Sequence, residues 1–327
     1  MSDSISLIRN TFSNNFSTEM LRNMGKAAEI IDGKKIAGEI KKELKRDIDK
    51  WMENNNNRAP SLVAILVGED PASKKYVQFK MQAAKEVGIT SSTIKLDSSV
   101  TENELLDLIN KLNKDDKCDG ILVQLPVPDH VSERRLCNAV DPKKDVDGFH
   151  INNIGKLCSN VDTFVPCTAL AVIELLKRSK IETFGKNVVV CGRSKNVGLP
   201  MAMLLHSDYR NELPGMEATV TMCHRNTPPD ELMYFTKRAD IIVSATGVVN
   251  LIKADMVKPG ACVIDVGITR IPTEDGKSKI VGDVDFEGVE KIAGHITPVP
   301  GGVGPMTVAM LMKNTFQAAK GLKAVIQ

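Results

Sequence analysis

Short apolar runs alternate with amphipathic stretches along most of this chain, and this alternation restricts the folds that it can adopt. Residues 61–67 and 187–191 are strand-sized and rich in Val, Ile and Leu. Within residues 36–51, in contrast, apolar residues recur at helical spacing with charged residues between them. Strands that are apolar on both faces are typical of parallel sheets covered by helices. The sequence therefore predicts an α/β fold.

The alternation forms two groups along the chain. In the first group, strands are predicted at 61–67, 90–96 and 120–125, and helices at 73–87 and 102–112. A helix at 168–178 leads into the second group, whose strands are predicted at 187–191, 218–223, 240–244 and 261–266. An amphipathic helix is predicted at 306–322. A length of 327 residues accommodates two domains of ordinary size, so we predict two α/β domains.

Charge and composition exclude several functional classes. The 43 basic and 41 acidic residues leave a net charge of +2, without the basic stripe of a nucleic-acid-binding domain. No apolar run approaches the roughly 20 residues of a membrane span. The seven cysteines are isolated and form no C-x-x-C pair, which predicts buried free thiols in a reducing compartment. The five histidines lack ligand spacing, so no zinc site is expected.

The first 27 residues differ from the remainder of the chain. They are rich in Ser and Asn, and Arg9, Arg22 and Lys26 lie between apolar residues. This composition is typical of a mitochondrial transit segment, although Asp3 and Glu19 depart from that pattern. A disordered tail without targeting function is the alternative.

A candidate phosphate-binding loop occupies residues 188–200, V-V-V-C-G-R-S-K-N-V-G-L-P. A strand leads into a loop with glycine, and a helix is predicted to begin near Val197. N–H groups at a helix start bind anions, and a small residue at Ser194 lets a pyrophosphate approach the backbone. Gly192, Ser194 and Val197 occupy the three positions of G-x-G-x-x-G. Because two of them are not glycine, an ordinary strand–turn–helix remains an alternative.

Arg225 follows the next predicted strand, where a Rossmann unit places the residue that contacts the cofactor ribose. An arginine there favours a phosphate, either on the cofactor or bound separately. A solvated surface arginine is the alternative.

Tyr76 and Lys80 are four residues apart and therefore share one helix face. A lysine beside an aromatic ring can hold a planar substrate and move a proton. Gln124 interrupts an apolar strand near its carboxyl end, where sites of α/β proteins lie. An exposed amphipathic helix and a glutamine bonded to a loop backbone are the respective alternatives.

Two further segments contain residues suited to ligand binding. The run K-K-D-V-D-G at 143–148 places two acids in a turn before a glycine, and the turn alone can explain the pattern. The run P-V-P-G-G-V-G-P at 298–305 is a stiff loop that permits close approach to a flat ligand. It can equally be a plain connection between domains.

The joint order of these motifs is more specific than any one of them. The runs are Y-V-Q-F-K, G-I-L-V-Q-L-P, K-D-V-D-G, P-C-T-A, G-R-S-K-N-V-G-L-P and P-G-G-V-G-P-M-T. In this order, from about residue 28 to 322, the chain resembles the methylenetetrahydrofolate dehydrogenase/cyclohydrolase family. The resemblance implies two α/β domains with a cleft between them, the second a Rossmann-type parallel sheet. It implies a tail at 1–27, a catalytic domain at 28–167 plus 305–327, and an NAD(P)-binding domain at 168–304.

The resemblance also implies an activity and its residues. The activity is oxidation of 5,10-methylenetetrahydrofolate to the methenyl compound, followed by hydrolysis to 10-formyltetrahydrofolate. Lys80 is implied as the catalytic lysine, Tyr76 as the ring against the folate, Gln124 as the partner of Lys80, and Asp147 as the group that grips the pterin. The implied folate-site residues are Tyr76, Val77, Gln78, Phe79, Lys80, Val123, Gln124, Leu125, Asp147, Pro300, Gly301, Gly302, Val303 and Gly304. The implied cofactor-site residues are Gly192, Arg193, Ser194, Val197, Arg225, Thr246 and Gly247.

Residues 206–217 favour one branch of that family. This connection is longer than in NADP-dependent cytosolic relatives and is similar to the mitochondrial NAD-dependent form. That branch implies inorganic phosphate held by Arg193 and Arg225, Mg²⁺ held with help from a carboxylate at Glu217, and the mitochondrial matrix. The family as a whole implies a homodimer. Glu217 stands where an aspartate is usual, and a glutamate can still reach Mg²⁺. The same reactions with NADP, a cytoplasmic location, and a non-catalytic folate- or nucleotide-binding relative are the alternatives.

Overall fold

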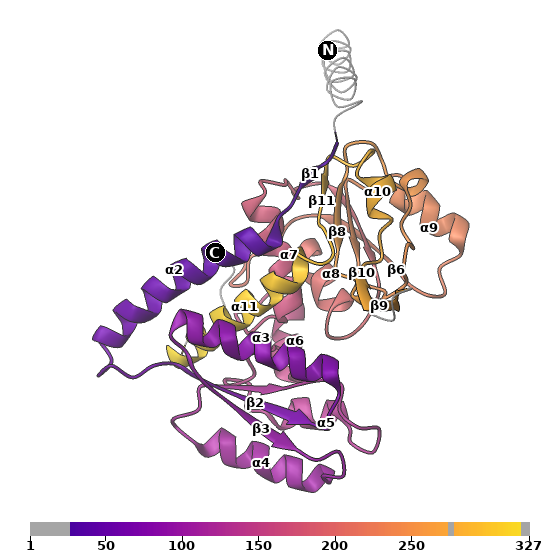
Figure 1. Cartoon of the computed structure of the whole chain (residues 1–327). Coiled ribbons are helices and arrows are strands. Elements are labelled where there is room, and N and C mark those ends of the chain that lie inside the picture. The colour runs from indigo at the N-terminus through magenta and orange to yellow at the C-terminus, as the bar shows by residue number, and fades with distance from the viewer. Residues whose placement is uncertain (1–26, 274–277, 322–327) are drawn as a thin grey trace. The chain divides into compact units, whose positions relative to one another are not determined.

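The computed structural model describes residues 27–273 and 278–321, and it shows the α/β fold that the sequence predicts (Figure 1). The described residues form two compact units. The six-stranded unit contains those within 1–32, 185–193 and 218–302, and the three-stranded unit contains those within 33–184, 194–217 and 303–327. The sequence prediction for the tail falls mainly on residues 1–26, which lie outside the described part of the chain.

The six-stranded unit is built on a parallel sheet with the strand order β1-β11-β8-β7-β5-β6. Its strands are β1 (Glu29–Ile30), β5 (Asn187–Cys191), β6 (Thr219–Cys223), β7 (Ile241–Ser244), β8 (Cys262–Asp265) and β11 (His295–Ile296). Strand β5 pairs with β6 on one side and with β7 on the other. The chain therefore reverses its direction of travel across the sheet between β5 and β7, and we call the carboxyl ends of these two strands the switch point.

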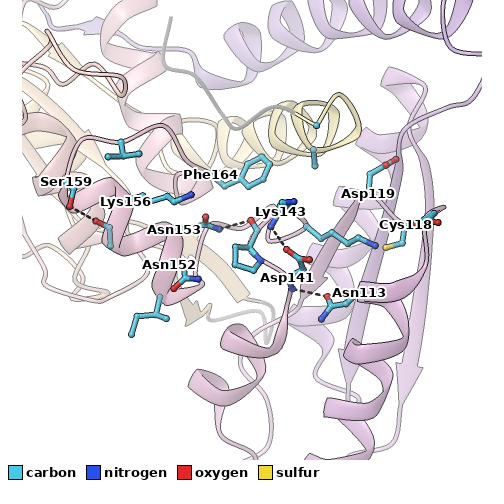
Figure 2. Close-up of a pocket in the computed structure, with 18 residues that line it drawn as sticks. Asn113, Cys118, Asp119, Asp141, Lys143, Asn152, Asn153, Lys156, Ser159 and Phe164 are labelled. Atoms are coloured by element: carbon cyan, nitrogen blue, oxygen red, sulfur yellow. Dashed lines mark hydrogen bonds between the residues drawn. The ribbon is translucent and has the colours of Figure 1, made fainter.

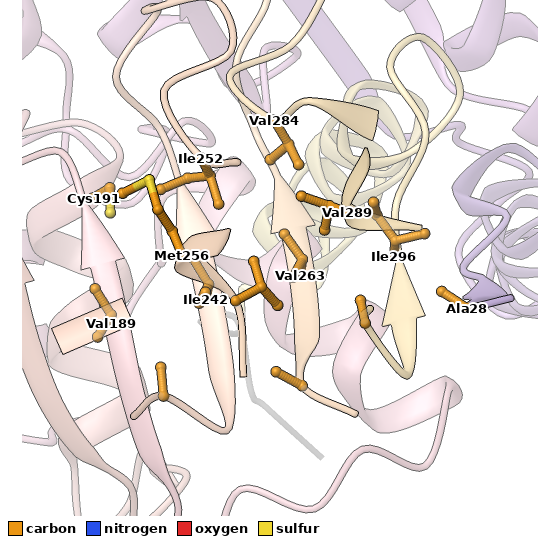
Figure 3. Close-up of a cluster of buried hydrophobic side chains, with 14 of the residues drawn as sticks. Ala28, Val189, Cys191, Ile242, Ile252, Met256, Val263, Val284, Val289 and Ile296 are labelled. Atoms are coloured by element: carbon orange, nitrogen blue, oxygen red, sulfur yellow. The ribbon is translucent and has the colours of Figure 1, made fainter. Parts of the chain in front are cut away.

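Shorter elements complete the six-stranded unit. They are α9 (Pro229–Thr236), the 3-10 turn η1 (Ala254–Met256), α10 (Phe286–Val289), and the antiparallel pair β9 (Thr269–Pro272) and β10 (Ser278–Val281). Figure 3 shows the core that joins the sheet to the segments covering one face. Val189, Ile242 and Val263 from three neighbouring strands pack in one cluster with Met256 and Val289. Each such buried side chain contributes about 1.5–3 kcal/mol to folding.

The three-stranded unit contains a smaller parallel sheet with the order β3-β2-β4. Its strands are β2 (Ser61–Val67), β3 (Thr90–Leu96) and β4 (Gly120–Val123). Its helices are α2 (Gly33–Glu53), α3 (Pro71–Val87), α4 (Glu102–Lys114), α5 (Glu133–Ala139), α6 (Ile151–Cys158), α7 (Cys167–Arg178), α8 (Gly198–His206) and α11 (Val303–Ala319). Helix α11 packs against α7 and α2, and α3 and α4 flank the sheet (Figure 1).

Local sequence signals set the bounds of the helices near the sheet. Helix α3 begins after Asp70, whose side chain accepts a hydrogen bond from the Ser73 N–H, and it ends before Gly88 in the left-handed conformation. Helix α4 begins at a capping box formed by Thr101 and Glu104. Because the Asp70 cap fixes the residue at which α3 begins, it also fixes which side chains lie on each face of this helix.

The structure differs from the sequence-based expectations at several places. Residues 28–32, assigned from the sequence to the first domain, lie in the six-stranded unit, because Glu29–Ile30 pairs with β11. Helix α7 and residues 194–217, assigned to the second domain, belong to the three-stranded unit. The predicted domain boundaries otherwise stay predictions. All seven cysteines are free, but Cys158 is exposed and Cys137 is only half-buried, so burial holds for the other five. No helix among the described residues is long and apolar enough to cross a membrane.

Candidate functional site

Lys80 and Gln124 come together in the three-stranded unit. Lys80 lies on α3 and Gln124 directly follows β4, and the Lys80 Nζ donates to the Gln124 Oε1 at 3.0 Å. The Gln124 Nε2 donates to the Leu125 carbonyl at 2.7 Å, which leaves the amide oxygen directed at the lysine. The Gln124 backbone N–H donates to the Ile65 carbonyl. The glutamine is therefore anchored on two sides, and it holds the ammonium without supplying a negative charge.

Asp147 supplies the nearby negative charge. Burial raises its pKa to about 6, the positive charge of Lys80 lowers that pKa, and Asp145 raises it. The preceding acid, Asp145, has a structural role, because its carboxylate accepts from the Phe149 and His150 N–H groups and from the Asn153 amide. The two acids of the K-K-D-V-D-G run thus differ in role. Asp145 fixes the turn, and Asp147 carries the charge that interacts with the lysine.

Asn314 of α11 was not singled out from the sequence, yet it braces the segment that carries Asp147. Its Nδ2 donates to the carbonyl oxygens of Val146 at 2.9 Å and of Val165 at 3.1 Å. Asn314 is fully buried. The signal that could have revealed it is an amide within the apolar stripe of a predicted amphipathic helix, because a buried amide must find hydrogen-bond partners.

The other residues implied for the folate site are not all available to a ligand through their side chains. Tyr76 is half-buried one turn before Lys80, and Phe79 is 51% exposed beside it. Val77 and Val123 are buried in the three-stranded unit, so their side chains are not exposed to a ligand. Of the glycine/proline loop, residues 300–302 end the six-stranded unit, and residues 303 and 304 begin α11.

The six-stranded unit places Gly192 at the switch point. Gly192 follows β5 with φ +112°, and a Cβ at this position would overlap the Ala245 carbonyl oxygen, just after β7. Its N–H donates to the carbonyl of Cys223, the last residue of β6, while the Ala245 N–H donates to the Cys191 carbonyl. The loops that follow β5 and β7 therefore approach each other at the backbone. This close approach, which only glycine allows, is the geometry expected where a dinucleotide meets a parallel sheet.

Arg193 and Arg225 are exposed, in the loops that follow β5 and β6. Gly247 is exposed as well, in the loop after β7, and the neighbouring Thr246 donates hydrogen bonds to the buried Asp283. These four predicted cofactor residues all follow neighbouring strands of one sheet at its carboxyl edge. That edge is where α/β folds bind ligands.

Ser194, Val197 and Glu217 belong to the three-stranded unit. The Ser194 Oγ accepts from the N–H of Gly198, the first residue of α8, at 3.3 Å. Glu217 has φ +54° and accepts from the Tyr209 N–H. The described ranges hold no group of three or more His, Cys, Asp or Glu side chains suited to a metal. The Mg²⁺ role of Glu217 therefore rests on one carboxylate, a number that Mg²⁺ accepts when water completes its ligands.

A pocket of about 1020 Å³ lies elsewhere in the three-stranded unit (Figure 2). It is lined by the end of α4, by most of α6, by the end of α11 and by the 141–144 turn, and none of the predicted site residues lines it. Many of its polar groups are paired within the protein. Lys144, for example, donates to the carbonyls of Leu112 and Asp115, and Asn153 donates to the Pro142 carbonyl. The pocket therefore gives no chemical indication of a ligand.

Comparisons with known proteins agree with the resemblance. The family model "Tetrahydrofolate dehydrogenase/cyclohydrolase, catalytic domain" matches residues 31–147, and the model of the NAD(P)-binding domain of the same family matches residues 166–323. The chain is 58% identical over 296 residues to the mitochondrial bifunctional methylenetetrahydrofolate dehydrogenase/cyclohydrolase of Gallus gallus, covering 90% of this chain and 88% of the relative.

Two solved structures are similar over most of the chain. A 5,10-methylenetetrahydrofolate dehydrogenase from the silkworm Bombyx mori superimposes with a TM-score of 0.85 and 61% identity, covering 90% of this chain and 98% of that one. The methylenetetrahydrofolate dehydrogenase-cyclohydrolase of Trypanosoma brucei, solved with NADP and an inhibitor, has a TM-score of 0.85 and 39% identity, with the same coverage.

Proposed function

Because this chain belongs to the tetrahydrofolate dehydrogenase/cyclohydrolase family, we propose that it catalyses two consecutive reactions of one-carbon folate metabolism. It oxidises 5,10-methylenetetrahydrofolate to 5,10-methenyltetrahydrofolate with a nicotinamide dinucleotide, and it then hydrolyses the methenyl compound to 10-formyltetrahydrofolate. The observation that carries the proposal is the hydrogen bond between Lys80 and Gln124, in electrostatic reach of Asp147. A chain that only bound folate would not need an anchored lysine there.

The hydrolysis needs proton transfer at a defined place. Water adds to the carbon of the methenyl cation and loses one proton. As the bond between that carbon and N5 breaks, the remaining hydroxyl loses its proton to become the formyl oxygen, and N5 gains one proton. Lys80 is the group that exchanges these protons, and Gln124 keeps its ammonium in place. Asp147 binds the amino edge of the pterin and holds the folate against the lysine. The net reaction consumes one water and releases one proton.

The oxidation depends on positioning. N5 and N10 donate electron density to the bridging methylene, which makes it a hydride donor, and the bound dinucleotide supplies the hydride acceptor. This chain provides the Gly192 loop and the exposed Gly247 backbone at the switch point to hold that dinucleotide. Tyr76 orients the folate ring on the side that carries Lys80. No residue needs to exchange a proton in the hydride transfer itself.

NAD is the proposed coenzyme, with Mg²⁺ and inorganic phosphate as activators. Arg193 and Arg225 are exposed at the same edge of the sheet, and two arginines suit a phosphate ion in place of the 2′-phosphate of NADP. Glu217 is the proposed carboxylate for Mg²⁺. The similar Gallus gallus protein is described as mitochondrial, which supports the mitochondrial matrix as the location, and we propose a homodimer. NADP is the second candidate, because Arg225 could instead contact its 2′-phosphate and a similar trypanosomal protein was solved with NADP.

A coenzyme assay tests this proposal directly. The purified protein receives methylenetetrahydrofolate with NAD or NADP, each with and without Mg²⁺ and phosphate, while formation and decay of the methenyl compound are followed. Turnover with NAD that requires both ions is the expected result. A preference for NADP that phosphate inhibits would instead assign Arg225 to the coenzyme. Absence of turnover with both coenzymes would refute the enzymatic proposal.

A further inference from the structure

Asp283 is a fully buried acid that anchors the loop after β7. It follows β10 in the chain, and its Oδ2 accepts three hydrogen bonds. The donors are the Ser244 hydroxyl at 2.8 Å, the Thr246 N–H at 2.6 Å and the Thr246 hydroxyl at 2.8 Å. One carboxylate oxygen therefore holds both the last residue of β7 and the turn that begins two residues later.

The Thr246 hydroxyl and N–H are both used within the protein in this arrangement. Its hydroxyl donates to Asp283 and accepts from the Val248 N–H at 3.2 Å, so the side chain is used to shape residues 246–248. Gly247, between them, is exposed, has φ +73° and has open space where a Cβ would lie. The Thr269 hydroxyl donates to the Gly247 carbonyl at 3.2 Å. The Gly247 backbone is therefore an exposed part of this loop whose conformation the Thr246 side chain helps to set.

A second buried acid fixes the position of Asp283. Asp265, at the end of β8, accepts from the N–H groups of Gly267, Asp283 and Val284. The packing leaves no room for side chains at two glycines, since a Cβ at Gly267 would overlap the Asp283 carboxylate and a Cβ at Gly282 would overlap that of Asp265. Burial, with a contribution from the Asp283 charge, raises the pKa of Asp265 to about 6.

This arrangement is costly if its only purpose is to close a turn. Two carboxylates are buried side by side, and the Asp283 Oδ1 has no hydrogen-bond partner among the described residues. A neutral amide or hydroxyl would brace the turn at a lower desolvation cost. A buried carboxylate, however, orients its donors more strongly than a neutral acceptor does, because charge-assisted hydrogen bonds are about twice as strong.

We propose that Asp283 is a positioning residue for the nicotinamide dinucleotide: through Ser244 and Thr246 it holds the Gly247 backbone at the switch point in the conformation that binds the coenzyme. The inference deepens the proposed function and rests on it. It assigns Thr246 a role that differs from direct contact with the coenzyme, because its side chain shapes the loop and only the backbone beside it meets the ligand. Asp283 acts through Thr246 and touches no substrate.

Hydrolysis of methenyltetrahydrofolate consumes no dinucleotide. The hydrolase rate of a variant can therefore serve as an internal control when its dinucleotide binding is tested. Asp283→Asn keeps the size of the side chain and removes its charge. Asp285→Asn is the matched control, since Asp285 lies two residues away and caps α10 through the Gly288 N–H without contacting the 244–248 segment. Dinucleotide binding is measured by titration with NADH followed by fluorescence, and the hydrolase rate is measured on the same preparations without dinucleotide.

The expected result for Asp283→Asn is a dissociation constant and a dehydrogenase KM for dinucleotide about 10-fold higher, which corresponds to losing the extra strength of a charge-assisted bond. The hydrolase rate is expected to stay within about 2-fold of the wild-type rate, and Asp285→Asn is expected to bind NADH normally. Equal loss of both activities in Asp283→Asn, or NADH binding as tight as in Asp285→Asn, would overturn the proposal.

A second pair of variants decides the matter if Asp283→Asn does not fold. Thr246→Val removes the hydroxyl that links Asp283 to Val248, and Thr246→Ser keeps it. Serine is expected to bind NADH more tightly than valine by about 10-fold, with equal hydrolase rates in the two variants. Equal NADH affinities would refute the inference. Failure of the proposed function is recognised separately, because the wild-type protein would then turn over no folate with NAD or NADP.

Discussion

At the scale of single residues, the sharpest prediction concerns Lys80. Its Nζ donates to Gln124 and its charge lowers the pKa of Asp147, so it is placed to exchange protons during hydrolysis. Lys80→Met keeps the apolar stem and removes the amine. We expect the rate of methenyltetrahydrofolate hydrolysis to fall by about 100-fold or more, the usual contribution of a positioned acid–base group. Folate binding, measured by titration, is expected to persist.

The control for this variant is Lys75→Met, on the same helix. Lys75 is exposed, and its ammonium lies over the Phe79 ring at 5.8 Å from the centroid. It should hydrolyse the methenyl compound at the wild-type rate. Hydrolysis by Lys80→Met at a near-normal rate would show that the protons move through another group.

The half-buried carboxyl group of Asp147 is predicted to lower the stability of the protein while it serves the activity. Its pKa is about 6 in the folded protein against an ordinary value of 3.8, so the unfolded chain binds fewer protons over that interval. The free energy of unfolding therefore decreases as the pH rises from about 4 to about 6, and the penalty is constant above that range. Asp147→Asn removes this loss of stability. We expect the variant to be more stable than the wild-type protein at pH 8 by up to about 3 kcal/mol, with no difference below about pH 4.

The same substitution should weaken folate binding, because a neutral amide replaces the charged acceptor. We expect kcat/KM for the folate to fall by about 10- to 100-fold at pH 8. Chemical denaturation at pH 3.5, 6 and 8 gives the stability profile, and the exposed Asp129→Asn serves as the control. A stability gain that did not depend on pH would contradict the assignment to this carboxyl group.

At the residue level, the structure contains one contact that the family resemblance implied. The expected hydrogen bond between Gln124 and Lys80 is present in the structure. Asn314 and Asp283 were missed, because neither lies in one of the motifs that carry the family resemblance, and their hydrogen-bond partners lie in distant segments of the chain. Nothing local to either residue indicates which turn it braces, so tertiary placement was needed to find them. The roles assigned to the site residues stay predictions until the variants are measured.

At the scale of elements, the C-terminal helix α11 stabilises the turn that carries Asp147. Asn314 donates to the Val146 and Val165 carbonyls from inside the core. Asn314→Leu keeps the volume but leaves both carbonyls buried without this donor, so we expect the free energy of unfolding to fall by about 2–4 kcal/mol. Thr315→Val is the control, because the Thr315 hydroxyl bonds only to the Leu311 carbonyl of its own helix, and it should cost less than about 1 kcal/mol.

The measurement for Asn314→Leu is the melting temperature together with the hydrolase rate of the folded protein. A lower melting temperature and a higher KM for the folate are expected, since the turn is no longer braced. A melting temperature equal to that of Thr315→Val would show that the Asn314 hydrogen bonds contribute little.

The predictability of the elements follows their length. Strands β2, β3 and β5 have the predicted bounds. Each is an uninterrupted strand of five to seven residues, which is long enough to be recognised in the sequence. Strands β1 and β11 were missed, since each has two residues and forms only by pairing with a strand far away in the chain. The short helices α5, α6 and α10 were also missed, because four to eight residues contain too few turns to show a helical period.

At the scale of the whole molecule, the two compact units divide the proposed chemistry. Lys80, Gln124 and Asp147 belong to the three-stranded unit, and Gly192, Gly247 and Asp283 belong to the six-stranded unit. The order of motifs along the sequence indicated that the proposed folate and coenzyme residues lie in different units. It did not indicate that residues 28–32 belong to the six-stranded unit, where Glu29–Ile30 pairs with β11. The chain passes between the units several times, and the motifs do not mark these crossings.

Gly192→Ala tests whether the two activities can be separated by one methyl group. A Cβ at Gly192 would overlap the Ala245 carbonyl oxygen, and φ of +112° is unfavourable for alanine, so the loops after β5 and β7 must move apart. We expect dehydrogenase activity and NADH binding to fall by about 100-fold, because we propose that the coenzyme meets the backbone at this point. Hydrolysis of methenyltetrahydrofolate, which uses the other unit, is expected to continue at the wild-type rate.

The matched control for this variant is Gly260→Ala in the same unit. Gly260 has φ +81°, but a Cβ there meets nothing within 4 Å, and it lies before β8, at the opposite edge of the sheet from the switch point. Gly260→Ala introduces the same kind of backbone strain as Gly192→Ala, but without an overlap between the new Cβ and a neighbouring atom. Both activities should therefore be retained. Retention of NADH binding in Gly192→Ala would remove the switch point from the coenzyme site. Equal loss of both activities would show instead that the substitution unfolds the chain, and circular dichroism distinguishes that outcome because the parallel sheet would then be lost.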